Sequence, residues 1–144
     1  MNQNLTLAVH ILGTIAYVEH HEQRPVTSGE LARCMGASSV VVRRILLKLQ
    51  QAGLLTSKRG PSGGSSLLRK PQDINLRQVW EAVMVEDALR PAGPRPERPD
   101  CEAVSVVIRD YLDGVYAQAQ CAFLSQLEHT SLQKMIDHIT TEVT

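Results

Sequence analysis

The sequence lacks the patterns that identify most enzymes and metal proteins. No nucleophile stands beside a general base in a recognisable motif, and the glycine-rich stretch at 60–64 does not have the G-x-x-x-x-G-K-[ST] form of a phosphate loop. The five histidines have no ligand spacing, and the three cysteines form neither a C-x-x-C zinc pattern nor a secreted disulfide framework. We therefore expect no enzymatic activity, no metal and no cofactor.

Long apolar runs are also missing. The stretch from Leu5 to Val18 is interrupted by Thr6, His10 and Thr14, and it is not preceded by the basic region of a signal peptide. No later run approaches the roughly 20 apolar residues of a membrane span. We expect a cytoplasmic protein with reduced thiols that does not associate with membranes.

An excess of charge of one sign is absent overall, because 15 Lys and Arg residues balance 15 Asp and Glu residues. The two halves of the chain are nevertheless different. Residues 1–73 carry nine basic and four acidic residues, a balance of +5, and the remainder carries six and eleven, a balance of −5. A basic half can attract a polyanion whatever the total charge, which keeps nucleic acid among the candidate partners.

The first half of the chain has the pattern of a helix-turn-helix. Apolar residues at helical spacing predict a largely buried helix that ends near His20. Residues 27–30 have the form of a capping box, in which Thr27 and Glu30 satisfy free backbone amides, and they begin a short helix at about 28–35. Gly36 supplies the turn, and a third helix runs from Ser38 or Ser39 to about residue 52.

The predicted third helix has one apolar and one cationic side. At 100° per residue, one side carries four aliphatic residues, and the other carries Val40, Arg44 and Leu47, with Arg43 and Lys48 on its flanks. The aliphatic residues are Val42, Ile45, Leu46 and Leu49. This helix is followed by two short strand candidates, 54–58 and 65–68, joined by a turn-rich loop at 59–64. Three helices and a basic-tipped hairpin predict a mainly α fold, a winged helix-turn-helix.

Such a fold places basic and hydroxyl side chains against DNA. Glycines in the wing allow the backbone to approach a phosphate, and Arg59 at a narrow tip suits the minor groove. The candidate DNA-binding residues are Ser28, Ser38, Ser39, Val40, Arg43, Arg44, Lys48, Lys58, Arg59, Gly60, Ser62 and Gly63. Two other interpretations stay open: a solvated charged helix face, and a winged-helix module that binds protein without DNA.

The second half of the chain is divided by a proline-rich stretch. A short helix capped by Asn75 and carrying Trp80 in the core ends the predicted DNA-binding domain at 1–85. Four prolines make 86–100 an extended linker, and 101–144 contains a long helix and a short terminal helix that begins at a capping box at 130–133. The long helix has an apolar stripe with no second core to cover it, so we expect it to pair with another copy of the chain. The stripe comprises Val104, Ile108, Tyr111, Leu112, Val115, Ala119, Ala122 and Phe123.

Several motifs resemble those of a known family. They are Pro25-Val26-Thr27 before Glu30-Leu31-Ala32, Ile45-Leu46-Leu47-Lys48-Leu49 with Ala52-Gly53-Leu54-Leu55, the wing Arg59-Gly60-Pro61-Ser62-Gly63-Gly64, and Ile74-Asn75-Leu76. Over nearly its whole length the chain resembles the Rrf2 family of winged-helix regulators, which includes IscR, NsrR and CymR. The resemblance implies a homodimer built by the long helix, with the third helix in the major groove and the wing in the minor groove of double-stranded DNA.

One departure from the family concerns iron. Cluster-binding members carry three closely spaced cysteines near the linker, whereas this chain has only Cys101 there. A [2Fe–2S] cluster needs about four ligands, so we expect no cluster.

The expected function is that of a sequence-specific transcriptional regulator, a repressor that binds an inverted-repeat operator. Its effector is unknown. An oxidant-driven disulfide between Cys34 and Cys101 of two subunits is one hypothesis for its signal, beside the alternative that each cysteine is a small packed residue. Cys121 is expected to pack.

Overall fold

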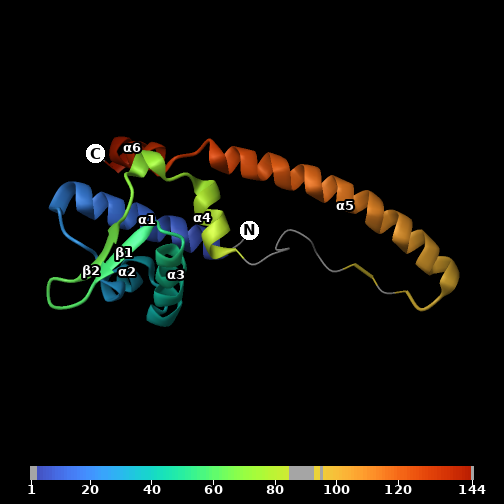
Figure 1. The fold of residues 1–144 in the computed structure, drawn as a ribbon, viewed down its shortest axis with the longest axis horizontal. Helices are drawn as coiled ribbons and strands as arrows, with labels where there is room; N and C mark the ends of the chain where they lie inside the picture. Colours follow the sequence, from blue (N-terminus) through green and yellow to red (C-terminus); the bar gives the residue numbers. More distant parts are fainter. Residues whose placement is uncertain (1–2, 85–92, 95, 144) are drawn as a thin grey trace. The chain divides into compact units, whose positions relative to one another are not determined.

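The computed structural model describes residues 3–84, 93–94 and 96–143. It is mostly helical with one two-stranded sheet, which confirms the predicted winged helix-turn-helix and its long C-terminal helix. The described residues of 1–84 and 127–144 form one compact unit, and those of 85–126 form a second. The elements, in chain order (Figure 1), are α1 (Gln3–Glu22), α2 (Ser28–Met35), α3 (Ser39–Gln51), β1 (Leu55–Lys58), β2 (Gly64–Leu67), the 3₁₀ turn η1 (Pro71–Asp73), α4 (Leu76–Val83), α5 (Pro99–Glu128) and α6 (Leu132–Val143).

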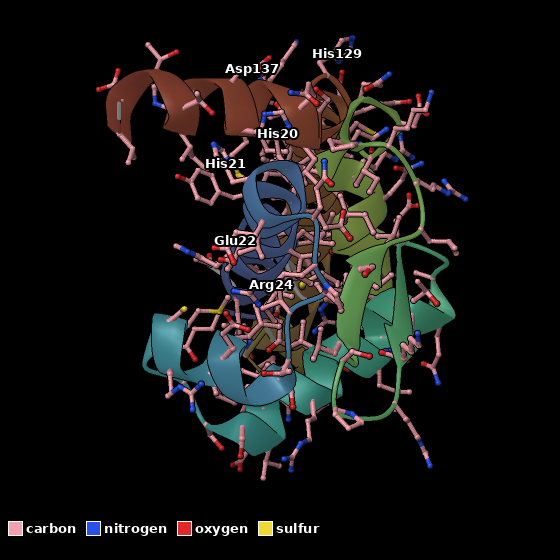
Figure 2. The ribbon with its side chains drawn as sticks, turned by 90° about the vertical axis from the view of Figure 1, so that its left-hand side faces the viewer. His20, His21, Glu22, Arg24, His129 and Asp137 are labelled. Carbon is pink, nitrogen blue, oxygen red and sulfur yellow. The ribbon has the colours of Figure 1, made fainter. Side chains whose placement is uncertain are left out.

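Helix α1 is the centre of the first unit. It packs against α2, α3, α4, β2 and α6, and Figure 2 shows it between α6 on one side and the α2–α3 pair on the other. Ile11, Leu12 and Ile15 are fully buried along it, as the apolar pattern predicted. Each such side chain contributes about 1.5–3 kcal/mol to stability relative to leaving it in water. The helix-turn-helix is therefore attached to a rigid support.

Two left-handed glycines end the helices of the helix-turn-helix. Gly36 has φ 60° after α2, where the N–H of Ala37 reaches the carbonyl of Ala32 at 3.1 Å. Gly53 has φ 75° after α3, with Leu54 N–H donating to Leu49 at 3.0 Å. In both places the chain turns sharply because glycine adopts this conformation without a Cβ clash.

The predicted cap of α2 is only half present. The Thr27 hydroxyl accepts a hydrogen bond from Glu30 N–H at 3.2 Å, as expected. The Glu30 carboxylate does not complete the reciprocal capping box, because it is paired with the guanidinium of Arg24. A charged partner binds a carboxylate more strongly than a neutral amide does, which explains the difference.

The wing is a two-stranded hairpin, and its strand β2 also forms a bridge to one residue outside the hairpin. Strands β1 and β2 pair in antiparallel register, with Leu55 opposite Leu67 and Lys58 opposite Gly64. Val26, in the segment before α2, forms a bridge to Ser65 with backbone hydrogen bonds of 3.0 and 2.8 Å. A Cβ at Gly64 would lie 2.8 Å from the Val26 backbone, so this approach requires glycine.

The last helix belongs to the first unit. Leu132 and Ile136 of α6 are buried against it, whereas the sequence assigned 101–144 to one C-terminal segment. Helix α6 also begins later than predicted, at Leu132, and the Ser131 hydroxyl just before it accepts a hydrogen bond from the N–H of Lys134 at 3.2 Å. The difference arises because a return of the chain to an earlier core leaves no local signal in sequence.

The remaining C-terminal predictions have mixed outcomes. Asn75 and Gln78 form the capping box of α4, and Trp80 is 8% exposed, both as expected. Of the predicted linker 86–100, residues 86–92 and 95 lie outside the described residues, and its last two residues begin α5. Among the helices described, none combines the length and apolar character needed to cross a membrane.

The helix-turn-helix geometry gives a test of the left-handed turn. Gly36→Ala should lower the free energy of unfolding by about 1 kcal/mol, because an L-residue is strained at positive φ. Gly29→Ala is the matched control: a Cβ there meets nothing within 4 Å inside α2, and alanine should raise stability by up to about 0.5–1 kcal/mol. Urea unfolding of both variants measures the contrast, and equal effects would contradict the assignment.

Candidate nucleic-acid interface

Helix α3 presents the cationic side that the sequence predicted. Val42, Ile45 and Leu49 are fully buried, which turns the opposite side outward. On that side Arg43 and Arg44 are exposed, Val40 is 70% exposed and Leu47 is 54% exposed, while Lys48 is half-buried. An exposed pair of guanidinium groups between two exposed aliphatic side chains matches what base edges and thymine methyl groups offer in a major groove.

Three candidate serines lie at helix starts. Ser38 is the residue before α3, has an extended backbone and is exposed, and its side chain makes no capping hydrogen bond to the helix. Ser39 and Ser28 are the first residues of α3 and α2, and both are half-buried. Hydroxyl groups and free N–H groups at helix starts are common phosphate ligands.

The wing tip carries the second group of candidates. Lys58, Arg59, Gly60 and Ser62 are exposed. Gly63 is buried instead: its N–H donates to the Gly60 carbonyl at 3.0 Å, and a Cβ there would lie 2.2 Å from the carbonyl oxygen of Lys58. Gly63 therefore shapes the turn, whereas the other four residues face outward.

Side-chain contacts that the sequence did not reveal hold the wing in place. Gln50 of α3 donates its amide to the Ser57 hydroxyl on β1, and that hydroxyl lies 3.4 Å from the hydroxyl of Ser65. Glu19 of α1 accepts a hydrogen bond from the N–H of Leu67 at 2.8 Å. These contacts join α1, α3, β1 and β2. Glu19 and Leu67 are 48 residues apart, so no local pattern could have identified their contact. They keep the wing and α3 in a fixed relation.

The charge of this part of the chain is of one sign. Residues 31–72 contain eight Lys and Arg residues and no Asp or Glu. Three of these cations, Arg33, Arg69 and Lys70, are exposed and were not among the predicted site residues. The uninterrupted basic stretch was the signal that could have included them.

The two nearest carboxylates before this stretch, Glu22 and Glu30, share one arginine as ion-pair partner. Arg24, in the connection between α1 and α2, donates to Glu22, which lies beside it in Figure 2. It also donates to Glu30 in a two-point contact of 2.7 and 3.0 Å. These hydrogen bonds to Glu30 and Glu22 raise the pKa of Arg24, and the same contact with Arg24 lowers the pKa of Glu30. The ion pair with Arg24 therefore reduces the repulsion that the Glu30 carboxylate would exert on a polyanion at the basic surface.

A surface groove lies elsewhere in the same unit. It has a volume of about 370 Å³ between α1, η1 and α6, with His20 and Asp137 in its lining. Figure 2 shows these two residues on the α6 side of α1, whereas α3 lies on the other side. The groove is thus separate from the basic surface.

The comparisons with known proteins agree with this geometry. The family model Rrf2, described as "Iron-dependent Transcriptional regulator", matches residues 1–138. The chain is 34% identical over 140 residues to "Putative HTH-type transcriptional regulator YwnA" of Bacillus subtilis, covering 96% of this chain and 98% of that protein.

Solved structures give the same fold. A crystal structure titled as that of "a putative DNA binding protein" has a TM-score of 0.71 and 30% identity, covering 93% of this chain and 99% of that one. The global cysteine regulator CymR of B. subtilis has a TM-score of 0.62 at 20% identity, with 96% of both chains covered. At that identity the likeness is one of fold.

The family description names iron, and the thiols of this chain do not fit an iron–sulfur cluster. Cys34, Cys101 and Cys121 are free and exposed, the last contrary to the expectation that it packs. Cys101 and Cys121 lie on one continuous helix, where 20 residues span about 30 Å, so they cannot bind one cluster within a chain. Among the described residues no group of three His, Cys, Asp or Glu side chains is placed to hold a metal ion. The expected absence of a cluster stays a prediction.

The outward basic face of α3, the basic wing beside it and the whole-chain matches lead to one assignment. They favour a DNA-binding regulator over both a protein-only interaction module and an enzyme. The chain belongs to the Rrf2 family of helix-turn-helix transcriptional regulators.

Proposed function

We propose that the protein is a homodimeric repressor that binds an inverted-repeat operator, with α3 in the major groove and the wing in the minor groove. The observation that carries the proposal is the pairing of two exposed basic elements, α3 and the wing tip, on a unit whose residues 31–72 contain no carboxylate. Two such surfaces, one per subunit and about 34 Å apart, read two half-sites on one side of a duplex. Bound over a promoter, they would exclude polymerase.

The proposed DNA contacts divide into two roles. Arg43, Arg44 and Val40 on α3 read bases, and the serines and Lys48 hydrogen-bond or attract phosphates. The wing residues Lys58, Arg59, Gly60 and Ser62 contact the backbone and the minor groove, while Gly63 keeps the wing in shape. Arg33, Arg69 and Lys70 add attraction that carries no sequence information.

Loss of a wing or α3 cation tests the DNA contacts. Arg59→Ala and Arg44→Ala should each weaken operator binding by about 1–3 kcal/mol if they reach base edges. Lys134→Ala is the matched control, because it removes a cation from α6, on the other side of α1, and should leave affinity unchanged. Fluorescence anisotropy at several salt concentrations measures the effect, and log K should fall with log salt with a slope of about −0.9 per phosphate contact. Wild-type affinity in Arg59→Ala would remove that residue from the interface.

The dimer is proposed from the surface of α5. None of the described residues of α5 is buried within the chain. Its large apolar side chains are exposed as well: Ile108 is 53% and Tyr111 75% exposed. Val107, which was not among the predicted stripe residues, is 68% exposed and lies three residues after Val104 on the same side of the helix. An apolar stripe of this length in water favours association with a second copy of the same helix.

A charge placed on the stripe tests the dimer. Ile108→Glu should dissociate the protein into monomers, because pairing would bury an unpaired carboxylate. Val106→Glu is the matched control: Val106 is 43% exposed but lies off the stripe, so that variant should stay dimeric. Analytical ultracentrifugation distinguishes the two, and two equally dimeric variants would contradict the proposed interface.

The redox hypothesis remains part of the proposal. Cys34 lies near the end of α2 and Cys101 in the first turn of α5, and both thiols are exposed and free. Peroxide would oxidise the two thiols of different subunits to one disulfide and be reduced to two waters, taking up the two electrons and two protons that the thiols release. The new covalent link would change how the two α3 helices are held.

Non-reducing gels test this pairing. After mild peroxide treatment the wild type should run as a covalent dimer, and Cys34→Ser and Cys101→Ser should each remain monomeric on the gel. Cys121→Ser is the control and should behave as the wild type does. Covalent dimers in the absence of Cys34 or Cys101 would rule out the proposed pair.

A further inference from the structure

We propose that the groove between α1, η1 and α6 is a binding site for a small primary ammonium ion with a compact apolar body, and that its occupancy alters operator binding through the wing. The groove has a volume of about 370 Å³, near the lower end of the range for small-molecule sites, about 300–1,000 Å³. All of its lining residues belong to the first unit. The effect on operator binding rests on the proposed function, whereas the binding site itself does not.

The packing of α6 against α1 and η1 forms the walls of the groove. Gly13 of α1 is buried, and a Cβ there would lie 2.9 Å from the methyl carbon of Met135 on α6. Leu132 of α6 is fully buried. These features bring the two helices close together and leave little freedom between them. The groove is therefore preformed.

The polar groups on the α6 side of the groove offer hydrogen-bond acceptors. Asp137 is exposed and carries a carboxylate. Gln133 donates an amide N–H to one oxygen of this carboxylate at 2.8 Å, and Thr141 donates its hydroxyl proton to the carbonyl of Asp137 at 2.9 Å. A hydroxyl whose one proton is used in this way can offer a ligand only its lone pairs. An ammonium ion, which has three N–H donors and a positive charge, matches this set of acceptors.

The charges at the groove also favour a cation over an anion. Its lining residues include Asp137 and no Lys or Arg. His20 lies in the last turn of α1, where the helix dipole adds partial negative charge. Figure 2 shows His20 and Asp137 where α6 lies beside the end of α1. A positive group bound here would lie between two regions of negative potential.

The remaining walls suit an apolar body. Ala16 and Ile136 line the groove and are only 3% and 7% exposed, and Pro71 of η1 is half-buried. Beside them the ring of His20 rests edge-on against that of His21, with 4.9 Å between their centroids. Apolar contact with Ala16, Ile136 and Pro71 removes surface of the ligand and of the protein from water together. A short branched aliphatic amine such as 3-methylbutylammonium represents the class.

Two short connections join the groove to the wing. Glu19, the residue before His20, accepts a hydrogen bond from the N–H of Leu67 at 2.8 Å, and Leu67 is the last residue of β2. Pro71, in the lining, begins η1 soon after that strand ends. A ligand in the groove therefore acts on both places where β2 is attached. It changes operator affinity by as much as it binds the free and the DNA-bound forms differently.

The first test measures binding by NMR titration of the full chain. The probes are 3-methylbutylammonium and 4-methylpentanoate, which have the same apolar body and opposite charges. The ammonium ion should bind saturably with a Kd of about 1 mM or lower, a reasonable affinity for a ligand of this size. The carboxylate should bind at least about tenfold more weakly, because it meets the charge of Asp137.

Two variants locate the site. Asp137→Asn should weaken binding of the ammonium ion at least about tenfold, since asparagine keeps an oxygen acceptor for Gln133 and removes the charge. Asp110→Asn is the matched control: it removes an exposed carboxylate from α5, outside the groove, and should keep the wild-type Kd. No saturable binding to the wild type, equal binding of the two probes, or equal Kd values in the two variants would overturn the site. The comparison of probes needs only the wild type, so it decides even if a variant misfolds.

The second test measures operator binding by fluorescence anisotropy. The ionic strength is held constant with sodium chloride, because DNA affinity depends on salt. Saturating 3-methylbutylammonium should change the operator affinity of the wild type at least about threefold and leave that of Asp137→Asn unchanged. Binding in the groove with no change in operator affinity would overturn the coupling to the wing. A wild type that binds no operator would refute the proposed function and not the groove site, which the NMR titration tests by itself.

Discussion

The burial of α1 is the constraint on which the rest of the structure depends. It is a helix with apolar residues on most of its surface, and such a helix is stable in water only when other elements cover it. Helices α2, α3, α4 and α6 and strand β2 provide that cover. Because α3 uses its aliphatic side for this packing, its cationic side has to face solvent. The position of the basic surface is thus a consequence of how the core is filled.

The same packing separates two surfaces of the unit. Around α1, one side of the unit carries α2 and α3, and the other carries α6 and the groove lined by His20 and Asp137 (Figure 2). The carboxylate nearest the start of α2, Glu30, is ion-paired with Arg24 before the basic stretch begins. Electrostatic attraction of a polyanion therefore acts on one side of the unit, although the whole chain has no net charge.

The joint between α4 and α6 gives the C-terminal helix a part in the DNA-binding unit. The chain leaves this unit after α4, and residues 127–144 belong to it again. Residues 128–132 are held in that unit by the backbone bridge between Asn75 and Ser131 and by the ion pair between Arg77 and Glu128.

The sequence by itself determined the local features: the glycine turns, the caps at Thr27 and Asn75, the two sides of α3 and the hairpin. Each depends on residues close together in the chain, whose spacing records the helical or strand period. Only the tertiary structure decided that Gly63 is buried, that Glu30 pairs with Arg24, that Glu19 and Gln50 hold the wing, and that α6 returns to the first core. The contact of Glu19 and the return of α6 join segments distant in sequence. The other features depend on how turns and helix ends fold against one another, which the period of a helix or strand does not encode.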